Sequence, residues 1–595
     1  MCGIAGVLFH RDDEGAPRRG HPAPSFTRVL RDRLAHRGPD GDGVYVDDGT
    51  ALVHTRLALI DPAGGAQPLQ TPDGRFVVVV NGEIYNHAAL RSSLAARGAV
   101  FRTRSDAEVL LWTLALRDVD GLDELEGEYA FCCWDTVRRR AILGRDPLGV
   151  KPLVVAAQAG AWWFASEVKA LLAVLPAPEL RPDVVVEAIV SPALSGEAIP
   201  WIGIENVPAG AVVVVDRSGS RIVKRAQRRP IALPTPELLA DALQSAVRDR
   251  MVADAPIGAF LSGGVDSSAI VKAALSSSSS SPLPCFSIRF EAHHAAIAGS
   301  IVVGDDVPYS ELLARAWPIE LVRVRADRQS LVDDIDALGA SQDRLAAWEQ
   351  ELTQRALARR ASSSVKAVLV GDAADETHFG YAFALAPEVC ASPMGLMERF
   401  GFSRRRRLLR PGLQTIADGL EGFYRDIART PFGDDVGANR RAMTTLLQAR
   451  WLPRLLHNGD LHTMAFGLEA RVPFSDRRVL DIAAAVPLEL GFVDGDDVPE
   501  KSFLRRAVAG WLPPSITARR KSALPRDDGL GPLFRDRLRL RLLDHGTRER
   551  LAGFLDLDAL NRLIDPADDV DAVDEDTGRA ILFSILALDA FLRHA

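Results

Sequence analysis

Cysteine is scarce in this 595-residue chain, which contains only five: Cys2, Cys132, Cys133, Cys285 and Cys390. Their number is odd, and no two of them stand in a CxxC arrangement. Disulfide frameworks and structural zinc sites normally depend on paired cysteines, so the sequence argues against both. Such sparse use of cysteine is typical of a protein in a reducing compartment, and we expect a cytoplasmic location.

Long apolar runs and a strong excess of one charge are also missing. No run approaches the roughly 20 apolar residues that span a bilayer, and no basic residue precedes the short apolar stretch Ile4–Phe9, as one would in a signal peptide. The net charge of −8 gives no indication of a polyanionic partner. Four arginines at 404–407 lack interleaved aromatic residues, which favours a solvated helix end. We therefore expect neither a membrane nor a nucleic acid as partner.

The length predicts two domains, and the first half is dominated by short β-prone runs that Gly, Asp and Pro separate. The expected strands are Ile4–Phe9, Phe76–Val80, Ala141–Gly144, Leu153–Ala156, Trp162–Ala165 and Ala211–Val215. Two helical segments, near Ser25–Leu34 and Ala107–Leu116, interrupt them. This pattern predicts a strand-dominated α/β sandwich over residues 1–217.

A basic, proline-rich stretch at 218–236 predicts a linker, and the pattern changes after it. Helices and strands then alternate, which predicts a doubly wound parallel sheet in a second domain, 237–595. The expected elements are helices Pro236–Met251 and Ser267–Leu275 and strands Pro256–Leu261, Pro284–Phe290 and Val365–Val370. Beyond about Leu408 the chain is expected to be mostly helical.

Cys2 is the most informative single residue, because removal of Met1 would make it the N-terminus. Its α-amine would then be available as general base for its own thiol, with a pKa near neutrality that suits the task. Taken alone, however, the position favours a small buried hydrophobe that happens to be cysteine.

Seven ordered motifs in the first half change that interpretation. They are MCGIAGV at the start, HRGPDG at 36–41, HTRLALID at 54–61, NGEIYNH at 81–87, RSDAE at 104–108, GRDPLGVKPL at 144–153 and FASEVKAL at 164–171. In this order they resemble the class II, N-terminal-nucleophile glutamine amidotransferase domain, over roughly the first 215 residues. The fold that the resemblance implies is an αββα nucleophile-hydrolase sandwich, with Cys2 as the nucleophile.

The same resemblance assigns roles to other residues. Arg56 binds the carboxylate of glutamine, for which a bidentate guanidinium is well suited, and Asp106 binds the ammonium. Glu83 helps to hold the glutamine, while Asn81 and the backbone N–H of Gly82 form the oxyanion hole. For Arg56 and Asp106 taken alone, a surface salt bridge is the alternative interpretation.

A glycine-rich turn, LSGGVDSS at 261–268, lies between the expected strand 256–261 and the helix that follows it. Backbone N–H groups at the positive end of a helix dipole make such a turn a phosphate cradle. It is shorter than a Walker loop and has no lysine. The turn resembles the pyrophosphate loop of the ATP pyrophosphatases; a hydroxyl-rich helix cap is the alternative.

A second cluster, GDAADETHFGY at 371–381, again follows an apolar strand and carries Asp372, Asp375 and Glu376. Carboxylates at a strand end beside a triphosphate indicate Mg²⁺. Two further segments, at 462–476 and 500–525, complete a pattern that resembles the synthetase domain of glutamine-dependent asparagine synthetases, from about Pro236 to Pro525.

That resemblance implies a full set of ATP-site residues. The pyrophosphate-binding residues are Leu261, Ser262, Gly263, Gly264, Asp266 and Ser267. Gly371 and the catalytic Asp372 lie near the AMP part, Asp266 and Asp375 are Mg²⁺ ligands, and Lys521 neutralises charge on the departing pyrophosphate. The cofactors implied are ATP and Mg²⁺.

The pairing of the two halves indicates the reaction. Amidotransferases that act on sugar phosphates need no ATP, whereas a carboxylic acid must be activated before ammonia can displace an oxygen. β-Lactam synthetases share the two-domain plan but have no N-terminal cysteine. We therefore expect glutamine-dependent amidation of an acid through an acyl-adenylate, with glutamine, ATP and the acid as small-molecule substrates and a homodimer as a possible assembly.

The acceptor acid is less well specified, since the chain departs from the common family form. Asp372 and Ala373 replace the glutamate and glycine of GEGADE, Arg289 stands where glycine is usual, and Asp333–Gln354 matches poorly. Aspartate is the default acceptor, but we expect it to be used inefficiently, with another, specialised acid preferred. A degenerate protein that only binds glutamine or nucleotide is the remaining alternative.

Overall fold

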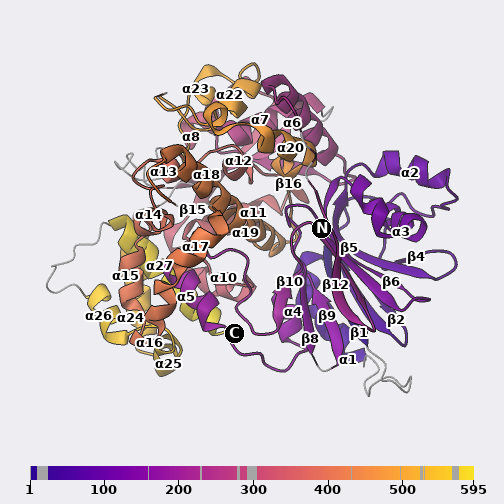
Figure 1. Cartoon of the computed structure of the whole chain (residues 1–595), viewed down its shortest axis with the longest axis horizontal. Coiled ribbons are helices and arrows are strands. Elements are labelled where there is room, and N and C mark those ends of the chain that lie inside the picture. The colour runs from indigo at the N-terminus through magenta and orange to yellow at the C-terminus, as the bar shows by residue number, and fades with distance from the viewer. Residues whose placement is uncertain are drawn as a thin grey trace.

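The computed structural model describes residues 2–9, 24–158, 160–227, 229, 231–277, 282–290, 305–429, 432–495, 497–522, 527, 529–565 and 575–594. A strand-rich N-terminal part, indigo to purple in Figure 1, lies beside a helix-rich part that contains the rest of the chain. Met1, whose removal the sequence analysis invokes, lies outside the described residues.

The N-terminal part contains two six-stranded antiparallel sheets. The first has the order β10 (Ile204–Asn206), β8 (Val154–Gln158), β9 (Ala161–Ala165), β1 (Cys2–Phe9), β3 (Thr50–Arg56), β2 (Gly41–Val46). The second has the order β12 (Gly219–Arg225), β11 (Ala211–Asp216), β7 (Arg140–Arg145), β6 (Gly127–Asp135), β5 (Phe76–Ile84), β4 (Leu69–Gln70).

The two sheets pack face to face with helices on their outer faces. Helices α1 (Pro24–Leu34) and α4 (Val168–Leu172) cover the first sheet, and α3 (Asp106–Arg117), with α2 (His87–Ala95) beside it, covers the second. In β5, Val77 and Val79 pack into the layer between the sheets, whereas Val78 and Val80 pack toward α3. Both faces of this strand are buried, which explains its continuous apolar run. The expected αββα sandwich is confirmed.

Two segments differ from a simple arrangement of two domains joined by a linker. Strand β12 pairs with β11 and lies within the range expected to be a linker, so the sheet continues to Arg225; residues 228 and 230 are not described. Helix α5 (Pro182–Val190) packs against α15 (Phe402–Leu408) and α16 (Pro411–Asp418). In Figure 1 it lies among the orange and yellow helices.

The second part is built on a parallel sheet. Its order is β15 (Ile319–Ala326), β14 (Leu283–Phe290), β13 (Ile257–Phe260), β16 (Ala367–Leu369), β17 (Glu469–Arg471). The chain winds outward from β13 in one direction and then from β16 in the other. In such sheets ligands bind beyond the carboxyl ends of the strands at which the order reverses, here β13 and β16. The expected doubly wound sheet is confirmed.

Helices surround this sheet and form the remainder of the chain, as expected for the region after Leu408. The first of them in chain order are α6 (Pro236–Arg250), α7 (Val265–Ser277), α8 (Val307–Ala316), α9 (Arg328–Asp333), α10 (Ile335–Ser341), α11 (Gln350–Ala361), α12 (Ala374–Thr377), α13 (Ala382–Leu385) and α14 (Pro393–Arg399).

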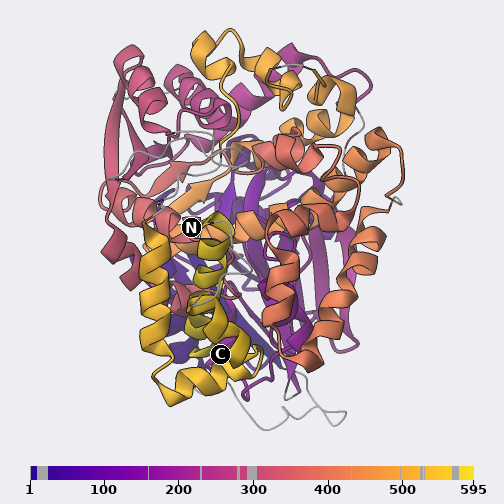
Figure 2. The same ribbon diagram turned by 90° about the vertical axis from the view of Figure 1, so that its left-hand side faces the viewer.

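The later helices are α17 (Leu420–Ala428), α18 (Val436–Leu446), the π-helical η3 (Leu447–Trp451), α19 (Leu452–Met464), α20 (Arg477–Ala485), α21 (Leu488–Gly491), α22 (Ser502–Val508), α23 (Pro514–Thr517), α24 (Leu530–Arg541), α25 (His545–Ala552), α26 (Leu557–Ile564) and α27 (Glu575–Leu592). The 3₁₀ turns are η1 (Ala35–Arg37), η2 (Asp118–Glu124) and η4 (Pro473–Ser475). Figure 2 shows the C-terminal helices as a layer beside the orange ones. None of the described helices has the length and apolar character needed to cross a membrane.

Candidate active sites

Cys2 lies at the start of β1, at the point where the two sheets of the sandwich meet. In the register of β1 and β3 it is directly opposite Arg56, and its N–H donates to Asn81 Oδ1 on β5 at 3.1 Å. The residue is 7% exposed. Burial raises the pKa of its thiol, and a hydrogen bond from Leu57 N–H opposes that rise. A thiol in this environment needs a base to become a nucleophile.

Asn81 and Gly82 have the properties of an oxyanion hole. Asn81 Nδ2 is buried and finds no hydrogen-bond partner in the described part of the chain, while its Oδ1 is held by Cys2. A buried donor without a partner is costly unless a ligand satisfies it. Gly82 has a φ of +134°, and a Cβ there would lie 2.0 Å from Glu128 O. Only glycine allows this backbone course beside the nucleophile.

Arg56 is held in a fixed orientation by the loop that follows β3. Its Nη1 donates to Pro62 O at 2.7 Å, and its Nη2 donates to Ile60 O and Asp61 O at 3.2 and 2.7 Å. Asp61 Oδ2 in turn accepts from Arg104 N, which belongs to the segment that carries Asp106. The loop therefore positions the guanidinium and ties it to the start of α3.

Glu83 and Asp106 form a pair of buried carboxyl groups, and Arg471 Nη2 lies 3.7 Å from Glu83 Oε1. Asp106, the first residue of α3, accepts from Ile84 N at 2.8 Å. Burial, Asp106 and Glu469 raise the pKa of Glu83 well above its usual value, and burial also raises the pKa of Asp106. Glu83 Oε2 has no partner among the described residues. An ammonium group placed here would relieve the repulsion, as the head of an amino acid does.

The second site lies at the carboxyl ends of β13 and β16, around a cavity of about 590 Å³. Ser262 Oγ lies 3.2 Å from Ser267 Oγ and accepts from Gly264 N at 3.3 Å. Gly263 has a φ of +71°, and a Cβ there would lie 2.4 Å from Tyr309 Cβ. Leu261 also lines the cavity. The expected phosphate turn is thus a tight loop at the N-terminus of the 13-residue helix α7.

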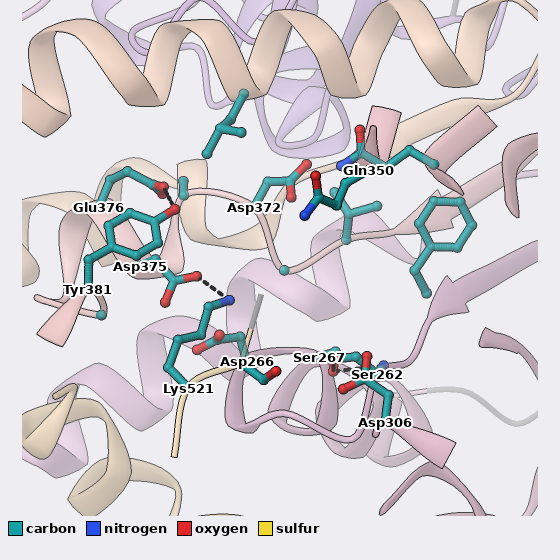
Figure 3. A pocket seen from close by; sticks show the side chains of 18 of the residues that line it. Ser262, Asp266, Ser267, Asp306, Gln350, Asp372, Asp375, Glu376, Tyr381 and Lys521 are labelled. Atoms are coloured by element: carbon teal, nitrogen blue, oxygen red, sulfur yellow. Dashed lines mark hydrogen bonds and ion pairs between the residues drawn. The ribbon is translucent and has the colours of Figure 1, made fainter. Parts of the chain in front are cut away.

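The loop after β16 faces this turn. Gly371, Asp372, Ala373 and Asp375 line the same cavity, and Figure 3 shows Asp372 and Asp375 directed into it. A Cβ on Gly371 would lie 3.3 Å from Asp266 Cβ, which measures how close the two loops come. Ala373 has a φ of +71°, a left-handed conformation that suits glycine and costs a residue with a Cβ about 1 kcal/mol.

Two lysines connect the carboxylates. Lys501 Nζ lies 2.5 Å from Asp266 Oδ2 and 2.5 Å from Asp375 Oδ1. Lys521 Nζ lies 2.7 Å from Asp375 Oδ2, and Figure 3 shows this ion pair. Burial opposes ionisation of Asp375, but the two lysine charges hold its pKa below the usual range. Burial lowers the pKa of Lys521, yet Asp375 and Asp266 raise it overall. Burial also raises the pKa of Asp372 to about 6, against the charge of Lys521.

Lys501 was not among the residues that the sequence singled out, although it lies in the EKSFLRRA segment. It is 2% exposed and has a φ of 56°. Asp306 and Arg519 were also missed: Arg519 contacts Asp306 at 2.5 Å and donates to Ser262 O at 2.9 Å, so the pair braces the phosphate turn. Arg289, by contrast, is exposed and does not line the cavity.

The donor set around Asp266 and Asp375 fits Mg²⁺. Both carboxylates approach the same ammonium, and Asp266 Oδ1 is buried without a hydrogen-bond partner among the described residues. Within that part of the chain no group of three or more His, Cys, Asp or Glu side chains forms a metal site. Mg²⁺ at nucleotide sites commonly takes one or two carboxylates and completes its shell with phosphates and water.

One helix, α19, connects the two sites. Asp460 accepts from Arg37 Nη1 at 2.8 Å and from Nη2 at 3.3 Å, and Arg37 Nε donates to Cys2 O at 3.1 Å. Arg37 Nη1 also donates to Glu167 at 2.7 Å. On the preceding residue, Gly459, a Cβ would lie 3.1 Å from Asp372 Oδ2. Adjacent residues of α19 therefore touch the surroundings of Cys2 and of Asp372.

Both halves of the chain match known protein families. Residues 1–225 match the glutamine amidotransferase domain, and residues 238–593 match the asparagine synthase model. The chain belongs to the asparagine synthase family. As a member of this family with both domains present, it is a glutamine-dependent ligase.

The asparagine synthase relatives are similar along most of their length. Asparagine synthetase [glutamine-hydrolyzing] 3 of Bacillus subtilis (strain 168) is 29% identical over 549 residues, which cover 88% of this chain and 87% of the relative. Asparagine synthetase [glutamine-hydrolyzing] 3 of Arabidopsis thaliana is 27% identical, over 92% of this chain and 82% of its own. Among solved structures, the glutamine phosphoribosylpyrophosphate amidotransferase of B. subtilis is 19% identical over 46% of this chain and 64% of its own, with a TM-score of 0.29.

Proposed function

We propose that this chain releases ammonia from glutamine at Cys2 and transfers it to a carboxylic acid that ATP has activated as an acyl-adenylate. The observation that carries the proposal is the double contact of α19. Asp460 is joined through Arg37 to the carbonyl of Cys2, and Gly459 lies against Asp372 in the cavity. Two sites that share one short stretch of helix are arranged for a common reaction.

In the glutaminase half, the α-amine exposed by removal of Met1 takes the thiol proton of Cys2. The sulfur then attacks the amide carbon, and Asn81 Nδ2 and Gly82 N–H donate to the oxyanion. The proton returns to the leaving nitrogen, ammonia departs, and a thioester remains that water hydrolyses to glutamate. Arg56 holds the substrate carboxylate, and Glu83 and Asp106 hold its ammonium.

In the synthetase half, Ser262, Gly264 and Ser267 present hydroxyl and N–H groups to the phosphates of ATP. The carboxylate of the acceptor attacks the α-phosphorus, and pyrophosphate leaves toward Lys521 and Lys501, whose charges offset its own. Asp266 and Asp375 are the residues that would hold Mg²⁺, which when bound offsets further phosphate charge. Ammonia then attacks the acyl carbon, and amide and AMP are the products.

Ammonia is proposed to pass between the sites inside the protein, along α19. The surroundings of that path are buried: Arg37 is 0% and Asp460 is 2% exposed, and Arg37 also contacts the buried Glu167. Ammonia that entered bulk water at neutral pH would be protonated to ammonium, which is not nucleophilic. A closed path preserves the reactive form.

Aspartate or a related acid is the acceptor that the family membership supports. A degenerate protein that only binds glutamine or nucleotide is the alternative. Two observations disfavour it: backbone carbonyl groups fix the guanidinium of Arg56, and Asn81 Nδ2 is buried without a partner among the described residues, ready to receive an oxyanion.

Product stoichiometry tests the proposal. With glutamine, ATP, Mg²⁺ and an accepted acid, glutamate, AMP and pyrophosphate should form in equal amounts with the amide. Formation of ADP and phosphate would exclude the acyl-adenylate, and absence of glutamate formation would exclude the role of Cys2.

A further inference from the structure

The end of the cavity that lies beyond Asp375 and Glu376 is lined by aromatic rings. Five of them are Trp348, Tyr381, Phe383, Phe400 and Trp451. In Figure 3, Tyr381 and Glu376 lie on the opposite side of Lys521 from Ser262 and Ser267. Tyr381, through which the other rings are connected by ring contacts, therefore lies away from the phosphate turn.

The rings form one continuous cluster. Trp451 is central, with centroid distances of 5.2 Å to Tyr381, 5.8 Å to Phe400 and 6.4 Å to both Phe383 and Trp348. Trp348 and Phe400 are 4.8 Å apart at an interplanar angle of 62°. Trp348, Phe383 and Phe400 are only partly buried, so they retain surface that a ligand can cover.

The backbone brings these rings together from separate segments. Trp348 precedes α11, Tyr381 and Phe383 belong to the start of α13, and Phe400 follows α14. Trp451 ends η3, a π-helical turn. Such turns are rare and occur frequently at functional sites. The altered segment Asp333–Gln354 contributes Trp348, so the departure from the family pattern falls on this part of the cavity.

The side chains that line the cavity carry an excess of negative charge, which disfavours aspartate as a substrate. Of the described lining residues, eight are acidic and two are cationic, Arg520 and Lys521. Lys521 is paired with Asp375, and Arg520 is exposed and donates to Asp497 O at 2.9 Å. Aspartate carries a second carboxylate, and a buried anion needs a paired cation. Two of the acidic lining residues lie beside the rings, since Glu351 accepts from the N–H of Trp348 and Glu376 accepts from the hydroxyl of Tyr381.

We infer that the preferred acceptor is a monocarboxylic acid with an aromatic ring, whose ring packs against Trp348, Phe383 and Phe400 while its carboxylate extends toward the phosphates of ATP. Ring–ring contacts at 4.5–7 Å in edge-to-face or offset geometry are favourable beyond the burial of area alone. An aromatic monocarboxylic acid can pack its ring against these side chains and does not bring a second, unpaired carboxylate into the cavity. This inference rests on the proposed function, since it names the substrate class of the same site.

The test is ATP–pyrophosphate exchange by the full chain with Mg²⁺ and a panel of acids. Phenylacetate, 3-phenylpropanoate and indole-3-acetate are compared with aspartate, glutamate and hexanoate. At least one aromatic acid should exceed aspartate in kcat/KM by about a hundredfold and hexanoate by about tenfold. A kcat/KM for aspartate, glutamate or hexanoate equal to or above the best aromatic acid overturns the inference and leaves the proposed function standing.

Two variants locate the effect. Trp348→Ala and Phe400→Leu should each lower kcat/KM for the aromatic acid about tenfold, mainly through KM, while exchange with aspartate changes little. The matched control is Phe423→Leu, at an exposed phenylalanine outside the cavity. Glutaminase activity, measured on every variant, reports whether the protein is folded.

The outcomes separate the two proposals. If the variants lower exchange with aspartate and with the aromatic acid equally, the rings have only a structural role and the inference fails. If no acid supports exchange while glutamine is still hydrolysed, the acyl-adenylate proposal itself fails, and the inference about its substrate fails with it.

Discussion

The two active sites differ in how closely their groups are packed. Around Cys2 the side chains of Asn81, Glu83 and Asp106 are buried, and Asn81 Oδ1 accepts a hydrogen bond from the N–H of Cys2. Around Asp372 the groups line a cavity of about 590 Å³. A site that binds one small, invariant substrate can be built tightly from short strand ends. A site that binds ATP and a second acid needs room, and the two ends of that room are free to differ in chemistry.

The same contrast applies within the synthetase cavity. Its phosphate end is a loop whose residue types the chemistry dictates, with Gly263 required by its left-handed backbone. Its other end is made of rings from four separate stretches of chain. Phosphate binding is common to all ATP-using enzymes, whereas the acceptor is particular to each, so the acceptor end is where members of one family are expected to diverge.

The largest expected effect is on the glutaminase site around Cys2. Cys2→Ala removes the nucleophile and should reduce glutamine hydrolysis by at least about a thousandfold. Amidation with added ammonium salts should persist, because the cavity does not contain Cys2. Cys390→Ala, at a buried thiol outside both sites, is the matched control. Normal hydrolysis by the Cys2 variant would show that the nucleophile is another residue.

The second expected effect distinguishes the activity of the synthetase cavity from that of the glutaminase site around Cys2. Asp266→Asn removes a carboxylate that contacts Lys501 and would hold Mg²⁺, so pyrophosphate release should fall about a hundredfold. Glutaminase activity should stay within about twofold of normal. Asp241→Asn, exposed on α6, is the control and should change neither rate. Equal loss of both activities would contradict the separation of the sites.

The third effect is on stability and concerns the sandwich. His54 is fully buried on β3, and burial lowers its pKa to about 3. Between pH 6.5 and pH 3 the unfolded chain binds this proton and the folded chain does not, so stability is complete above pH 6.5 and declines as pH falls.

From pH 7 to pH 5 this histidine should cost about 2 kcal/mol, from roughly 1.4 kcal/mol per pH unit below 6.5. His54→Gln should therefore show a smaller loss of the free energy of unfolding over this range, measured by urea unfolding of the glutaminase half. His545→Gln, whose side chain is 85% exposed, should behave as the unmodified protein does. An unchanged pH dependence in the His54 variant would exclude its neutral state.

The smallest effect sharpens the description of the cavity loop. Ala373→Gly should stabilise the protein by about 1 kcal/mol, because glycine adopts a φ of +71° without a Cβ penalty. Ala507→Gly, within α22, should destabilise it by about the same amount. Calorimetric melting temperatures should thus shift in opposite directions. A decrease for Ala373→Gly would mean that the left-handed conformation is wrongly assigned.

Much of the fold was predictable because it follows local patterns. The continuous apolar run Phe76–Val80 predicts a buried strand and the amphipathic pattern of 236–251 predicts a helix, and both elements are observed. Strand β17 was missed, since Glu469 and Arg471 do not look like buried strand residues. Arg471 is buried only because Glu469, Arg250 O and Val252 O bind its guanidinium, and such tertiary partners are invisible in a local pattern.

In the candidate sites too, residues within motifs were predictable, whereas residues brought together only by the tertiary fold were not. Most residues assigned to the ATP site line one cavity, but the role given to each residue at either site stays a prediction. Arg37 and Asp460 are 423 positions apart, and no spacing rule connects them. The five rings of the cavity likewise share no motif. The cytoplasmic location, a homodimer and the absence of a nucleic-acid partner also stay predictions.

Isotope transfer tests most directly whether the two sites act as one. The chain is supplied with glutamine labelled with ¹⁵N in its amide, together with ATP, an accepted acid and a large excess of unlabelled ammonium. Internal transfer along α19 predicts an amide product that is almost entirely ¹⁵N. Asp460→Asn, which weakens the contact with Arg37, should lower that enrichment. A product of the unmodified chain whose nitrogen matches the isotopic composition of the bulk solution would contradict the coupling of the sites.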